Sequence, residues 1–89
     1  MTQYSRNPAV RDTGVDDEIF LIAPDGEDLF YLNRISSGIW RALAEPRDAG
    51  ELAALFAGAF PDIDPARIDA DVRAALTELL DRTLIVAGG

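Results

Sequence analysis

The side chains of this sequence that could do chemistry are almost all carboxylates. Sixteen Asp and Glu residues stand against eight Lys and Arg residues, and the sequence contains neither histidine nor cysteine. The commonest general acid–base, the commonest metal ligand and any thiolate site are therefore absent. Paired carboxylates alone could support glycosidase-type chemistry, but a chain of 89 residues rarely encloses a deep, dry pocket. We expect no enzymatic activity, no cofactor and no metal.

The net charge of −8 also limits the partners. Nucleic acid is a polyanion whose binding needs a basic surface, so we expect no nucleic-acid partner. A basic peptide or a basic partner protein suits the charge better, although acidic side chains also serve solubility alone. The N-terminus has no apolar signal core, and no apolar run approaches the about 20 residues of a membrane span. We expect a cytoplasmic protein without a membrane partner.

The first secondary-structure elements predicted along the chain, which would position any site, are strands. Hydrophobic residues make up 48% and charged residues 27% of the chain, which is typical of one folded domain covering residues 1–89. The polar residues 1–7 are expected to be disordered. Extended segments at 9–12, 18–23 and 28–32 predict a three-stranded antiparallel sheet, and the last two are joined by the Pro24-Asp25-Gly26 turn.

Helices follow this sheet region of residues 8–33. After Asn33, a good helix N-cap, the apolar period changes to about 3.6 residues. A second helix begins at Asp48, which forms a capping box with Glu51, and a third begins near Pro65. Residues 34–86 therefore form a three-helix part, whose apolar end at 84–86 packs as a last strand or as an extended tail. The order of elements predicts an α+β class, a small winged helix-turn-helix-like domain.

The third strand is a candidate binding element. It carries no Lys or Pro to discourage pairing at an edge, and an open edge can accept an extended segment of another chain. Phe30 and Leu32 should face one side of the sheet and Leu29 and Tyr31 the other. One pair is then core and the other is half-exposed apolar surface. The alternative is that all four side chains are buried on the two faces of the sheet.

The third helix has a core stripe and a candidate binding flank. The apolar stripe consists of Ile68, Val72, Leu76, Leu79 and Leu80. The flank consists of Arg67, Asp71, Ala75, Glu78 and Arg82. Ala75 is small enough to leave space for a bulky side chain, and Asp71 and Glu78 could pair with basic residues. The alternative is a solvated flank with ion pairs at a spacing of four, from Arg67 to Asp71 and from Glu78 to Arg82.

An ordered set of short motifs across roughly residues 8–86 resembles the PqqD family. The set comprises Leu32-Asn33, Ile39-Trp40, Glu51-Leu52, Phe60-Pro61-Asp62, Asp71-Val72 and Leu84-Ile85. Two turns depart from the family pattern, because Glu45-Pro46-Arg47 and Thr83 stand where members often have glycine. Members of this family are leader-peptide recognition elements in pathways that make ribosomally synthesised, post-translationally modified peptides.

The resemblance implies that the leader of a precursor peptide binds as an added strand on the third strand, beside the third helix. The predicted peptide-binding residues are Leu29, Phe30, Tyr31, Leu32, Arg67, Asp71, Ala75 and Glu78. It also implies a non-catalytic adaptor that delivers the precursor to a leader peptidase, a cyclase or another modifying enzyme, in a lasso-peptide or related pathway. The alternatives are a winged-helix transcription regulator, against which the acidic charge argues, and a structural subunit of a larger enzyme.

Overall fold

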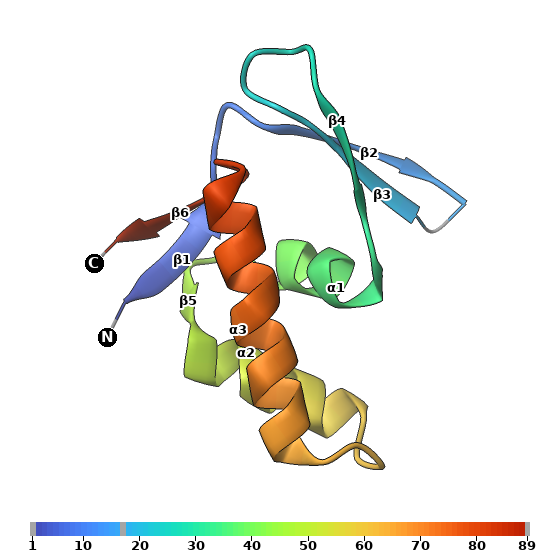
Figure 1. Ribbon diagram of the computed structural model, residues 1–89, viewed down its shortest axis with the longest axis vertical. Coiled ribbons are helices and arrows are strands. Elements are labelled where there is room, and N and C mark those ends of the chain that lie inside the picture. The colour runs from blue at the N-terminus through green and yellow to red at the C-terminus, as the bar shows by residue number, and fades with distance from the viewer. Residues whose placement is uncertain (1, 17, 89) are drawn as a thin grey trace.

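The computed structural model describes residues 2–16 and 18–88, so Met1, Asp17 and Gly89 lie outside the description. The described residues form two three-stranded antiparallel sheets and three helices (Figure 1). The strands are Gln3–Arg6 (β1), Arg11–Val15 (β2), Glu18–Ile22 (β3), Leu29–Leu32 (β4), Arg47–Asp48 (β5) and Ile85–Gly88 (β6). The helices are Arg34–Ala42 (α1), Ala49–Ala59 (α2) and Pro65–Asp81 (α3). The predicted α+β class is confirmed, in an arrangement compatible with a small winged-helix-like fold.

The first sheet has the strand order β2-β3-β4. The turn between β3 and β4 contains Gly26 at a φ of 77°, a backbone conformation that glycine adopts without a side-chain clash. Beside this turn the Ala23 N–H donates to the Asp28 carbonyl at 2.8 Å. Strand β2 lies further along the chain than the predicted segment 9–12. All its residues are exposed, so it is held by pairing with β3 and carries no alternating apolar pattern that would mark its position.

The second sheet has the strand order β5-β1-β6, and the prediction of disorder for residues 1–7 is wrong because of it. Residues 1–7 are not disordered where the structure describes them, since β1 pairs with β5 on one border and with β6 on the other. The fold therefore has a second sheet in addition to the single one predicted, and the apolar C-terminal end is a strand. The Arg6 side chain also anchors β1, because it donates to the Trp40 carbonyl at 2.9 Å and lies over the Trp40 ring.

The helices begin at the predicted residues. Asn33 caps α1 by accepting a hydrogen bond from the Ser36 N–H, Asp48 caps α2 in a capping box, and Pro65 is the first residue of α3. None of the helices in the described part of the chain is both long enough and apolar enough to cross a membrane.

The core lies between the inner face of the first sheet and the helices. Its largest fully buried side chains come from β3, the helices and the C-terminal end, and they are Leu21, Ile39, Leu52, Val72, Leu76, Leu84 and Ile85. The predicted stripe on α3 is buried, except that Leu80 is only half-buried. Gly38 lets α1 and α2 approach closely, because a Cβ at this position would lie 2.5 Å from the Phe56 ring.

Candidate functional site

Strand β4 has one border without a partner strand in the described part of the chain. The hydrogen bond from Ala23 to Asp28 fixes the alternation of the antiparallel ladder. Phe30 and Leu32 therefore direct their backbone N–H and C=O groups to β3, whereas Leu29 and Tyr31 direct theirs to the open border. The C-terminal strand β6, which could have covered this border, pairs with β1 in the other sheet. Leu29 and Tyr31 thus each offer one donor and one acceptor to an incoming extended segment.

The side chains of β4 alternate between the core and solvent. Leu32 is 4% exposed and Phe30 packs half-buried against the core, whereas Leu29 is 62% and Tyr31 57% exposed. The alternative that all four side chains are buried is therefore excluded. On the outer face of the sheet, the Tyr31 ring lies 5.4 Å from the Phe20 ring, measured between centroids. Neither a charge nor a proline within β4 protects its border from pairing.

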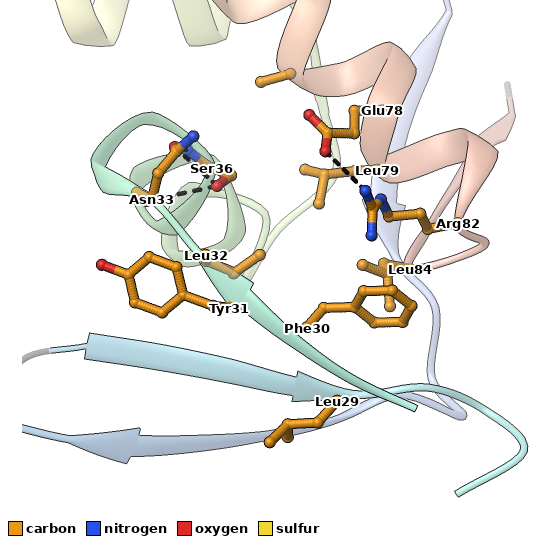
Figure 2. Close-up of a pocket in the computed structure, with 11 residues that line it drawn as sticks. Leu29, Phe30, Tyr31, Leu32, Asn33, Ser36, Glu78, Leu79, Arg82 and Leu84 are labelled. Carbon is orange, nitrogen blue, oxygen red and sulfur yellow. Dashed lines mark hydrogen bonds and ion pairs between the residues drawn. The ribbon is translucent and has the colours of Figure 1, made fainter. Parts of the chain in front are cut away.

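A groove of about 230 Å³ lies between β4 and α3 (Figure 2). Its strand wall is Leu29–Leu32, its helix wall is Ala75, Glu78, Leu79 and Arg82, and Asn33, Ser36 and Leu84 complete the lining. Leu79 and Leu84 are almost fully buried, so they form an apolar floor. We call this cavity the groove. Its combination of an apolar floor and unpaired backbone groups suits an extended peptide with at least one apolar side chain.

Arg82, the C-cap residue of α3, reaches toward β4 at one end of the groove (Figure 2). Its guanidinium lies 5.0 Å from the centroid of the Phe30 ring and 3.1 Å from the Glu78 carboxylate. Both charged side chains are substantially exposed, at 46% and 64%, and such exposed pairs contribute about 0–1 kcal/mol. The pair can therefore separate at little cost when a segment enters the groove.

Most of the predicted site residues meet at this groove. Those that line it are Leu29, Phe30, Tyr31, Leu32, Ala75 and Glu78. Arg67 and Asp71 do not line it. They lie nearer the N-terminus of α3, where both line another cavity, and their side chains are 3.9 Å apart. Both predicted ion pairs of α3 are present, while the binding role of these residues stays a prediction.

Five residues that line the groove are outside the predicted peptide-binding set, namely Asn33, Ser36, Leu79, Arg82 and Leu84, and of these only Arg82 was assigned to the candidate flank of the third helix. Asn33 was predicted only as a helix cap. Its side-chain oxygen accepts hydrogen bonds from both the N–H and the hydroxyl of Ser36, each at 2.9 Å. The available signal was that Asn33 directly follows the candidate strand. Leu79 and Leu84 were assigned to the core and to the apolar end, and no local pattern shows that a core side chain also forms the floor of a groove.

The fold and the groove define a small α+β domain that presents an open strand edge beside a helix. The family model for Coenzyme PQQ synthesis protein D (PqqD) matches residues 18–85, and the chain belongs to this family. A similar solved structure is described as TbiB1 in complex with the TbiA(beta) leader peptide. It is 25% identical with a TM-score of 0.80, and the match covers 91% of this chain and 93% of that one. No curated protein matches the chain. The predicted resemblance to the PqqD family is confirmed.

Proposed function

We propose that this protein is a non-catalytic adaptor that binds the leader segment of a ribosomally made precursor peptide. The observation that carries the proposal is the open border of β4 beside the groove. Membership of the PqqD family and similarity to TbiB1, a protein solved with a leader peptide, support a leader as the occupant.

Strand addition divides the binding energy between backbone and side chains. Leu29 and Tyr31 can exchange hydrogen bonds with the leader backbone, each contributing about 0.5–1.5 kcal/mol whatever the leader sequence. An apolar leader side chain between Ala75 and the floor at Leu79 would add about 1.5–3 kcal/mol on full burial. The groove therefore supplies selectivity, and the small side chain of Ala75, which is half-buried, leaves room for it.

The wider setting is also part of the proposal. The adaptor presents the remainder of the precursor to a leader peptidase, a cyclase or another modifying enzyme in the cytoplasm, in a lasso-peptide or related pathway. The family resemblance supports this setting. The reading frames next to the gene test it, because a short precursor beside a peptidase and a cyclase is the expected arrangement.

The decisive experiment removes one backbone donor, together with the exposed Tyr31 ring, from the open border. The Tyr31 N–H points away from β3, so Tyr31→Pro removes a donor to the leader without removing a ladder bond to β3. The matched control is Gly14→Pro on β2. Gly14 lies between residues that bond to β3, so its N–H faces the far border of the same sheet.

We expect Tyr31→Pro to weaken binding of the labelled leader of the neighbouring precursor about two-fold to ten-fold in a fluorescence anisotropy titration. Gly14→Pro should bind as wild type does, and circular dichroism should show that both variants remain folded. Wild-type affinity in a folded Tyr31→Pro variant would refute strand addition at β4.

A further inference from the structure

The groove continues along α3 beyond the end of β4. It shares Asn33, Ala75 and Glu78 with an adjoining depression of about 230 Å³. That depression shares Ile35 and Asp71 with a third cavity of about 170 Å³, which we call the crevice. The crevice lies where the start of α1, the end of α2 and the start of α3 meet. A continuous path therefore runs from the open border of β4 to the N-terminal end of α3.

The crevice is apolar inside and carries charge at its rim. Its apolar lining consists of Ile35, Phe56, Phe60, Ile63 and Ile68. Ile63 is 41% exposed, and the stacked rings of Phe56 and Phe60 lie 6.2 Å apart between centroids. The rim carries Arg34, Arg67 and Asp71. An apolar side chain entering the crevice would be covered on several sides, which is the arrangement that makes burial favourable.

The two arginines of the rim are poorly neutralised. Arg34 is the first residue of α1, where a positive charge opposes the helix dipole, and the first turn of α1 contains no acidic residue. Among residues 2–16 and 18–88, the Arg34 guanidinium makes no ion pair. Arg67 reaches Asp71 only at 3.9 Å, and its side chain is 77% exposed. These two guanidinium groups can each bind a carboxylate of the occupant, and Asp71 is the acidic residue on the same rim.

We infer that the crevice binds a second part of the same peptide that occupies the groove, namely an apolar side chain next to an acidic residue. The inference rests on the proposed function. Ala75 and Ile68 lie on α3 seven residues apart, which is about 10 Å along the helix at about 1.5 Å per residue. An extended peptide covers this distance in about three residues.

The direction of the peptide follows from the commoner mode of pairing. Antiparallel pairs outnumber parallel ones, and a peptide antiparallel to β4 has its N-terminal part at the Asn33 end, from which the path to the crevice starts. The apolar anchor and its acidic neighbour therefore precede the strand-forming part by about three to four residues.

The test uses a phage-displayed library of random peptides of about 16 residues, long enough for both parts at about 3.3 Å per residue. Selections run on the wild-type chain, on Ile63→Ser, on Arg34→Ala and on Leu55→Ser. Leu55→Ser is the matched control, because Leu55 is 49% exposed, much as Ile63 is, but does not line the crevice.

We expect wild type and Leu55→Ser to select a strand-forming segment preceded by an apolar residue with an acidic neighbour. Ile63→Ser should lose the apolar preference and Arg34→Ala the acidic one, while both keep the strand-forming segment. For a selected peptide, alanine in place of the apolar anchor should weaken binding to wild type about ten-fold and change binding to Ile63→Ser by much less.

The remaining outcomes of the selection contradict either the crevice inference alone or the groove proposal as well. Selection of a strand-forming segment alone, or the same two-part motif on Ile63→Ser and Arg34→Ala, overturns the crevice inference and leaves the groove proposal standing. If no peptide is enriched on wild type, the groove proposal fails and the inference fails with it.

Discussion

Replacing Ala75 with aspartate tests the groove most directly. The half-buried Ala75 side chain forms part of the helix wall, one turn from Glu78 and above the apolar floor at Leu79. A carboxylate at this position would either keep its hydration water in the groove or lose it at high cost. In both cases a Val- or Leu-sized peptide side chain loses most of the about 1.5–3 kcal/mol that its burial provides. We expect the Kd of Ala75→Asp to rise about ten-fold to one-hundred-fold.

The matched control for this change is Ala70→Asp. Ala70 lies on the same helix, is exposed and does not line the groove. Aspartate is a poorer helix former than alanine by about 0.5–0.7 kcal/mol, so both variants should unfold a few degrees below wild type. Only Ala75→Asp should also lose affinity.

The assay is fluorescence anisotropy with one labelled peptide from the wild-type selection, at about 0.15 M and about 0.5 M salt, where exposed charges are increasingly screened. The expected loss persists at high salt, because it arises from desolvation and lost burial in addition to repulsion. A folded Ala75→Asp variant that binds within about two-fold of wild type, or an equal loss in Ala70→Asp, would refute the reasoning.

Three further experiments test the fold and its charge. Gly38→Ala should lower the free energy of unfolding by about 1–3 kcal/mol in urea titrations, because the added Cβ meets the Phe56 ring; unchanged stability would contradict the close approach of α1 and α2. Arg6→Ala should cost about 1–2 kcal/mol through its lost contacts with Trp40, whereas the exposed Arg11→Ala should stay within about 0.5 kcal/mol. The net charge of −8 predicts no mobility shift of duplex DNA even at low salt, and a shift would revive the transcription-regulator alternative.

Local patterns in the sequence were sufficient to predict where the helices begin. They were also sufficient to predict that the side chains of β4 divide between two faces and which face of α3 turns toward the core. The caps at Asn33 and Asp48 and the proline at the start of α3 act within a few residues of themselves, so their patterns survive in any tertiary context. The alternation along β4 and the apolar stripe of α3 are likewise set by the periods of strand and helix. The resemblance to the PqqD family was carried by the ordered set of short motifs from Leu32-Asn33 to Leu84-Ile85.

Only the tertiary structure decided which edges and surfaces remain open. The second sheet joins β1 to β6 from the opposite end of the chain, and strand pairing over such a separation depends on packing that no local pattern encodes. The same pairing keeps β6 away from β4 and leaves its border free. Packing likewise placed Leu79 and Leu84 under the groove and Arg67 and Asp71 beside the crevice, because a helix flank faces different neighbours along its length.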